Sequence, residues 1–100
     1  MAVDTKAYEQ AFNAAGLDFE YGEDAPGKVY TPHVHGWTKL VTLAGSIHLR
    51  TAAGWQDQHE GDECEVMSGE LHEAVVGPDG WKWLAAWKPE EADTFSVHET

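Results

Sequence analysis

The most informative parts of this sequence are residues 27–45, GKVYTPHVHGWTKLVTLAG, and residues 61–76, GDECEVMSGELHEAVV. The first carries His33 and His35 one residue apart, and the second carries His72. Alternate residues of a β-strand point to the same side, so His33 and His35 present two imidazoles to one point in space. A third imidazole from another strand completes a facial ligand set with open positions for a substrate. We therefore expect His33, His35 and His72 to bind a divalent transition metal, for which zinc, iron, manganese and nickel all qualify.

Short runs of strand-forming residues, separated by turn residues, fill the rest of the chain. The expected strands are residues 17–21, 28–35, 38–44, 46–51, 55–59, 63–67, 72–76 and 81–88. Glycine, proline and acidic residues lie between them, including Gly45 and the stretch 77–80. Many short strands at close spacing predict an all-β antiparallel sandwich or barrel.

The two ends of the chain differ from this pattern. Residues 4–15 predict a short amphipathic helix, with Asp4 or Thr5 as its N-cap and Gly16 as its stop. Pro89 ends the last clear strand, and residues 89–100 are an acidic, polar tail. One hundred residues leave room for one core, so we expect a single domain over 1–100, with the barrel at about 17–88.

The alternation of apolar residues indicates which strand faces point inward. In 46–50, Ile47 and Leu49 belong in the core. In 81–88, Trp81, Trp83 and two further apolar residues share one face, while lysines lie on the other, so the tryptophan face should point inward. Such a face either fills a small core, which we favour, or lines an apolar pocket.

The composition excludes several partners. The chain has 18 acidic and 6 basic residues, for a formal charge of −12, so it should repel nucleic acid and anionic membranes. Its single cysteine, Cys64, permits no intrachain disulfide. No stretch has the length of a membrane span, and the first residues lack the pattern of a secretory signal. We expect a cytoplasmic protein.

The two stretches resemble the paired motifs of the cupin family, small β-barrels of the RmlC-like kind. Gly27, His33 and His35 fit the spacing of the first motif, and Gly61, Gly69 and His72 fit the second. The likeness covers residues 27–76 directly, and the flanking strands extend it. It implies a small antiparallel jelly-roll barrel, and cupin-like barrels of this size commonly pair as homodimers.

One departure from the first motif bears on function. The family places a glutamate ligand after the histidine pair. In this chain its place falls on Lys39 when counted forward from His35, or on Thr38 when counted back from Gly45. Three histidines without the carboxylate leave a bound dication its full charge, which favours an anionic or chelating substrate. An inward Lys39 would repel the metal or pair with a bound carboxylate, so loss of metal altogether also stays open.

Other residues are weaker candidates. Glu73 follows His72 directly and should point the opposite way, and Glu70 reaches the site only if its loop folds inward. Cys64, with acidic neighbours, should be an unreactive buried residue. Trp37, Lys39 and Trp83 are candidate pocket-lining residues. The remaining histidines, His48, His59 and His98, are each isolated in the sequence and suit solvent-facing positions.

These observations leave two leading functional hypotheses. The first is a metal-dependent cupin enzyme that acts on a small organic molecule, of oxygenase or isomerase type. The second is a non-catalytic cupin that binds a small ligand as a sensor or carrier, with or without metal. A structural or storage role ranks last. Metal content distinguishes the first two.

Overall fold

The structure is a computed structural model that describes residues 3–91. Its elements are α1 (Thr5–Ala14), β1 (Asp18–Asp24), β2 (Val29–His33), β3 (Thr38–Thr51), β4 (Gly54–His59), β5 (Glu63–Val66), β6 (His72–Trp87) and the 3-10 helix η1 (Pro89–Glu91). All strand pairs are antiparallel. The expected fold class, an antiparallel barrel with a short N-terminal helix, is therefore confirmed.

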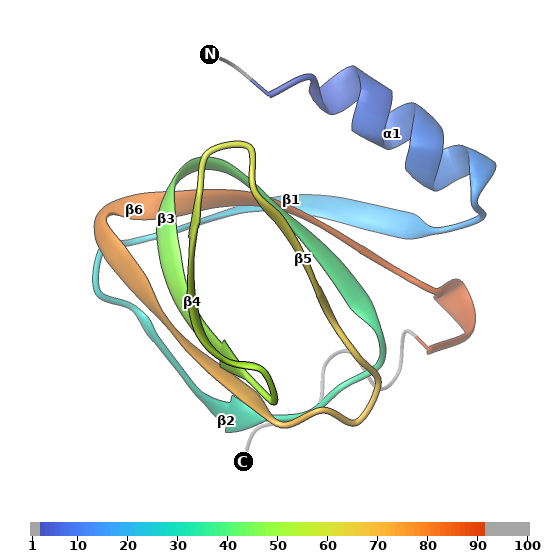
Figure 1. Cartoon of the computed structure of the whole chain (residues 1–100). Helices are drawn as coiled ribbons and strands as arrows, with labels where there is room; N and C mark the ends of the chain where they lie inside the picture. Colours follow the sequence, from blue (N-terminus) through green and yellow to red (C-terminus); the bar gives the residue numbers. More distant parts are fainter. Residues whose placement is uncertain (1–2, 92–100) are drawn as a thin grey trace.

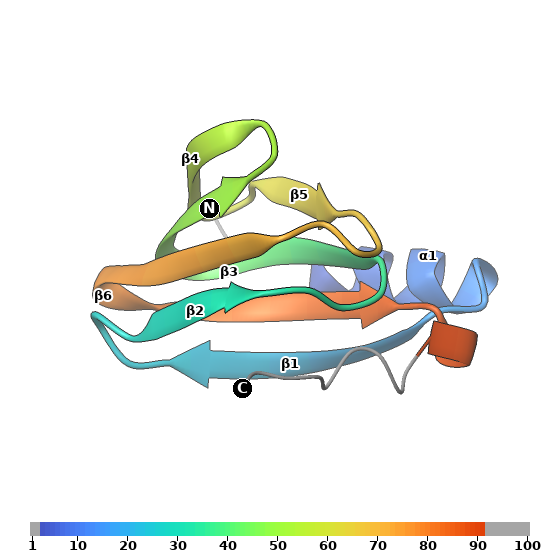
Figure 2. The same ribbon diagram turned by 90° about the horizontal axis from the view of Figure 1, so that it is seen from below.

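Two long strands, β3 and β6, hold the barrel together (Figures 1 and 2). The first half of β3 pairs with β5 and with the second half of β6, which in turn pairs with β1. The second half of β3 pairs with β4 and with the first half of β6, which pairs with β2. The result is two facing sheets, β1-β6-β3-β5 and β2-β6-β3-β4, that share their two central strands.

The long strands correct the expectation of chain breaks at Gly45 and at residues 77–80. Both sites lie inside continuous strands, and both coincide with irregular pairing of β3 with β6. Gly45 has φ +73°, and a Cβ there would lie 2.0 Å from the carbonyl oxygen of Gly80. The glycines therefore let β3 and β6 bend together from one sheet into the other. In the sequence, glycines at such a bend look the same as glycines in a turn.

Each bend also keeps core side chains on both sides of it pointing into the barrel. Thr42 and Ile47 both point inward although they are an odd number of residues apart, as do Val76 and Trp81. Strict alternation would put the members of each pair on opposite faces, so an irregular residue between them is required. The predicted inward positions of Ile47 and Trp81 are confirmed, since both are buried in the inner core.

Helix α1 covers the outer face of the β1-β6-β3-β5 sheet. Asp4 caps it, its Oδ1 accepting a hydrogen bond of 3.1 Å from the Ala7 amide. Phe12 packs on Val41 and Leu84, and all three are almost fully buried. The expected helix is thus present and packs across a sheet face, and this sheet is apolar on both sides at its centre.

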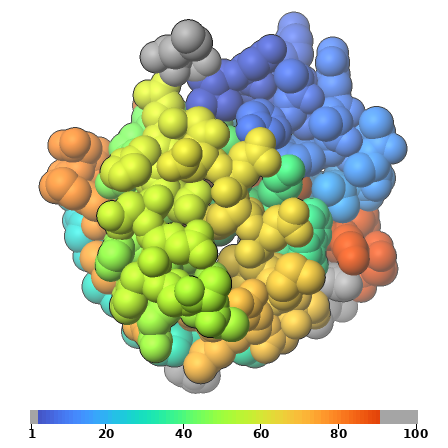
Figure 3. Space-filling view, viewed as in Figure 1, coloured from blue at the N-terminus to red at the C-terminus, as the bar shows by residue number. Residues whose placement is uncertain are grey.

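Figure 3 shows the surface over β4 and β5, with α1 at its upper right. Within residues 3–91, no helix has the length and apolar character that a membrane crossing needs. Of the expected tail 89–100, residues 89–91 form η1 and the rest lies outside the described residues.

Candidate metal centre

Three histidines meet inside the barrel: His33 ends β2, His72 begins β6, and His35 lies just beyond β2, which stops short of the expected end at residue 35. His33 and His72 are direct partners across β2 and β6, and His35 follows two residues after His33. The His33–His72 ring centroids lie 4.1 Å apart, those of His35 and His72 4.5 Å, and those of His33 and His35 5.4 Å. One ring nitrogen of each lies within 4.8 Å of the others. The structure thus brings together the three residues that the sequence motifs single out.

The backbone orients all three rings in the same way. The Nδ1 atoms of His33, His35 and His72 lie 2.6, 2.7 and 2.9 Å from the carbonyl oxygens of Thr31, Gly36 and Glu70, respectively. A carbonyl oxygen only accepts, so each Nδ1 carries a proton, and in the neutral ring Nε2 is then the atom with the lone pair. This arrangement of a ligand nitrogen backed by a hydrogen-bonded second nitrogen is typical of metal-binding histidines.

Burial keeps His72 neutral. It is only 6% exposed, and desolvation lowers its pKa to about 4, with a smaller contribution from the charges of His33 and His35. The Glu70 carbonyl acts in the opposite direction but does not offset burial. Near neutral pH this imidazole is therefore in the unprotonated form that ligates a metal.

The three rings line a cavity of about 450 Å³ between the two sheets. Aliphatic and indole side chains form most of its wall, among them Leu40, Ile47, Leu49, Trp81 and Trp83. The candidate Trp83 is therefore a pocket residue. Trp81 lines the pocket and also fills the core, its Nε1 donating to the Thr42 hydroxyl at 2.9 Å.

A nearly buried carboxylate, Asp24, fixes the aromatic side of this cavity. Its side chain is 10% exposed and accepts hydrogen bonds from Trp83 Nε1, at 3.1 Å, and from the Tyr30 hydroxyl. The Lys28 ammonium lies 3.3 Å away. Burial, followed by the bond to Asp24, raises the pKa of Tyr30. Sequence reasoning missed this network because residues 22–27 have the composition of a turn, whereas β1 continues to Asp24.

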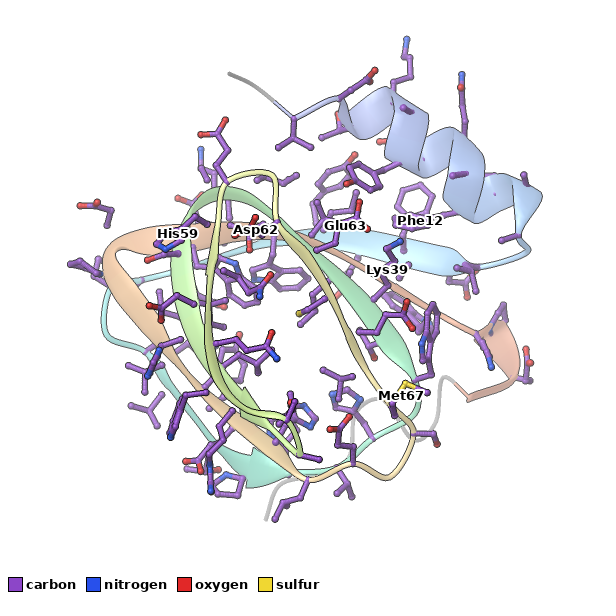
Figure 4. The ribbon with its side chains drawn as sticks, viewed as in Figure 1. Phe12, Lys39, His59, Asp62, Glu63 and Met67 are labelled. Atoms are coloured by element: carbon purple, nitrogen blue, oxygen red, sulfur yellow. The ribbon has the colours of Figure 1, made fainter. Side chains whose placement is uncertain are left out.

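Of Thr38 and Lys39, Thr38 occupies the position at which the family motif has its carboxylate ligand. Thr38 faces the cavity, is 2% exposed, and places its Oγ1 3.4 Å from His35 Nδ1. Lys39 points to the outer side of the sheet, with its Nζ 3.0 Å from Glu63 Oε1 beside α1 (Figure 4). Trp37 also lies outside, where its Nε1 donates to Glu65 at 2.9 Å. Trp37 and Lys39, expected as pocket-lining residues, therefore do not line the pocket.

The two neighbouring glutamates serve the loops and the outer surface. Glu73 points outward and accepts hydrogen bonds from the Arg50 guanidinium. Glu70 closes the loop before β6 by accepting from the amides of Met67 and Ala52, each at 2.9 Å. Neither carboxylate joins the histidines, as the sequence predicts.

Of the other singled-out residues, Cys64 is half-buried and not fully buried as expected, and the two described histidines lie where the sequence predicts them. Cys64 packs against the inner core, and burial, with a smaller effect of Glu65, raises the pKa of its thiol to about 11. His48 and His59 are exposed. His98 lies outside the described residues.

No family model and no curated protein matches this chain. Solved structures do. A cupin superfamily protein from Desulfitobacterium hafniense aligns at TM-score 0.64 and 18% identity, over 72% of this chain and 66% of its own. An RmlC-like cupin from Shewanella frigidimarina aligns at TM-score 0.66 and 20% identity, over 78% and 70%. A variant of oxalate decarboxylase from Bacillus subtilis aligns at TM-score 0.66 and 22% identity, over 73% and 21%.

The fold and the site together define a class: small antiparallel β-barrels with a histidine-lined internal pocket. Within that class, the structural matches show that the chain has the cupin fold. The chain spans just under two thirds of the Desulfitobacterium hafniense protein.

Proposed function

We propose that this protein binds a divalent transition metal through Nε2 of His33, His35 and His72 and uses it to hold a small organic molecule in the adjoining cavity. The observation that supports this most directly is the shared ring orientation. All three Nδ1–H groups donate to backbone carbonyls, which leaves three lone pairs to converge on one point. Zinc, iron, manganese and nickel all accept such ligands.

The charge of the site favours an anionic or chelating ligand. The three imidazoles are neutral ligands, and Thr38 supplies no negative charge where the family motif has a carboxylate. A dication would keep its formal charge and act as a Lewis acid toward ligand oxygens. The apolar and indole walls would exclude water from the bound molecule and strengthen this attraction.

We favour turnover of the bound molecule, which makes the protein a metal-dependent cupin enzyme. One structural neighbour of the same fold is an oxalate decarboxylase, which supports a catalytic use of such a barrel. The alternative is a non-catalytic sensor or carrier of a small ligand. The absent carboxylate ligand and the two indoles that line the cavity favour that alternative.

Metal analysis tests the proposal. Protein purified without chelators and reconstituted with each candidate metal should retain about one equivalent, as measured by mass spectrometry of the metals. The variant His35→Ala should lose this metal and keep the circular dichroism of the fold. His48→Ala removes an exposed imidazole on the outer surface and should keep the metal. Retention of metal by folded His35→Ala would refute the site. Stoichiometric iron, manganese or nickel would favour the enzyme over the carrier.

We further propose that the protein is a cytoplasmic homodimer. Its cysteine is free, so the described fold depends on no oxidising compartment. Edge strands such as β1 and β4 carry unpaired backbone groups that a second copy can cover. Light scattering after size exclusion should give twice the 11.0 kDa chain mass.

A further inference from the structure

An acidic side chain that the family motifs do not include lies in the same cavity as the three histidines. Glu20 is on the inner face of β1, directly opposite the buried Ala85 of β6. Because β6 bends at residues 77–80, Ala85 and His72 belong to facing sheets. Glu20 therefore faces the cavity from one sheet, and His72 faces it from the other. Of the described residues that line the cavity, Glu20 is the only acidic one.

Glu20 and the residues beside it on the inner face of β1 form a surface that suits a cation. Glu20, Gly22 and Asp24 alternate along the inner face of this strand. The Trp83 indole lies across Gly22, since a Cβ there would be 2.0 Å from Trp83 Cζ2. Asp24 is engaged by Trp83, Tyr30 and Lys28. Glu20, by contrast, has no hydrogen-bond or ion-pair partner within residues 3–91.

The position of Glu20 also separates it from the metal site. The ligand atoms of the three histidines form one group within 4.8 Å, and the Glu20 carboxylate is not part of it. A carboxylate that lines the cavity outside the ligand group is free to bind the other end of a molecule held there. The adjacent indole face attracts cations, because the ring carries negative potential on its face.

We propose that the ligand is amphoteric, with a carboxylate that binds the metal and an ammonium group that binds Glu20 beside Trp83, joined by a short apolar chain. This inference rests on the proposed metal site. The overall charge of −12 supports it, because the field of the protein disfavours a ligand with net negative charge more than a zwitterion. The aliphatic wall between the two ends suits the apolar chain.

Calorimetric titration of the zinc-loaded protein with simple acids tests this inference. The probes are β-alanine, γ-aminobutyrate and δ-aminovalerate, each compared with the acid of equal chain length that lacks the amine, namely propionate, butyrate and valerate. For at least one length, the amino form should bind about three- to tenfold more tightly, the range expected for a solvent-exposed ion pair with a cation–π contact. In Glu20→Gln this preference should vanish, while zinc and butyrate affinities stay unchanged.

The matched control is Glu23→Gln. Glu23 is exposed on the outer face of the same strand, opposite Lys82, so this variant removes the same charge away from the cavity and should keep the preference. Equal binding of amino and plain acids by zinc-loaded wild type, or a preference that survives Glu20→Gln, would overturn the inference and leave the metal site standing. Failure of the wild type to bind any of zinc, iron, manganese and nickel would overturn the proposed function together with the inference.

Discussion

Thr38 is the residue at which this pocket departs most clearly from the cupin motif. It lies beside His35 with its hydroxyl donating to the Gly36 carbonyl at 3.2 Å, so it tightens the turn between β2 and β3. Its side chain faces the cavity, whereas that of Lys39 faces α1. Inward orientation, and not spacing alone, decides which of these two positions can supply a ligand.

Thr38→Glu should therefore strengthen metal binding. A carboxylate at this position would add a negative charge next to the three imidazoles, and we expect the zinc affinity to rise about tenfold or more. The metal-free variant should be less stable, by about 1–3 kcal/mol, because a larger, charged group replaces a buried threonine. Competition with a chromogenic chelator measures the affinity, and urea unfolding measures the stability.

Lys39→Glu is the control for this prediction, because it places a carboxylate at the other candidate position of the motif. Its side chain would lie outside the barrel near Glu63, so zinc affinity should stay within about twofold of wild type at this distance from the metal. A gain in affinity for Lys39→Glu equal to that of Thr38→Glu would contradict the orientation described for this strand.

At the scale of whole elements, the paired bends of β3 and β6 decide how the pocket closes. Gly45 lies against the backbone of Gly80, where the two strands cross from one sheet to the other. The close approach needs both a positive φ and the absence of a side chain. Without it the two sheets could not face each other, and the histidines would lose the opposite wall of their cavity.

Gly45→Ala should lower the free energy of unfolding by about 3 kcal/mol, through backbone strain and the collision of the new methyl group with the Gly80 carbonyl. Gly16→Ala separates the two causes. Gly16 has φ +74°, against +73° for Gly45, but a methyl group there would meet no other part of the protein within 4 Å, so strain alone should cost about 1 kcal/mol. Equal losses in urea unfolding would show that the contact between the bends contributes nothing.

The bends of β3 and β6 are the part of the fold that the sequence does not predict. Alternation within a short segment correctly predicts that Ile47 and Leu49 point inward, because this depends on local parity. The convergence of His33, His35 and His72 follows from the spacing of the two motifs and from the pairing of β2 with β6. The bends depend on a contact between residues far apart in the chain, and their glycines have the composition of ordinary turns. Glu20 lies inside the expected strand 17–21, and its role as a pocket residue depends on which face of that strand meets the cavity.

At the scale of the molecule, the acidic surplus acts on the fold as a whole. The chain has 18 acidic against 6 basic residues, and Lys28, Lys39 and Arg50 already pair with acidic neighbours. The folded chain has extents of 34 × 33 × 22 Å, so the excess carboxylates repel one another over distances comparable with the Debye length of about 10 Å at 0.1 M salt.

Added salt should therefore stabilise this protein. Screening reduces repulsion among many carboxylates while it weakens only a few ion pairs, which are worth little at exposed positions. We expect the midpoint of urea unfolding at pH 7 to rise between about 0.01 and 0.5 M sodium chloride, with most of the rise below about 0.2 M, where the Debye length changes most. A neutral osmolyte at matched osmolality controls for solvent exclusion. A midpoint that stays flat or falls would show that the ion pairs outweigh the repulsion, and that the acidity costs the fold nothing.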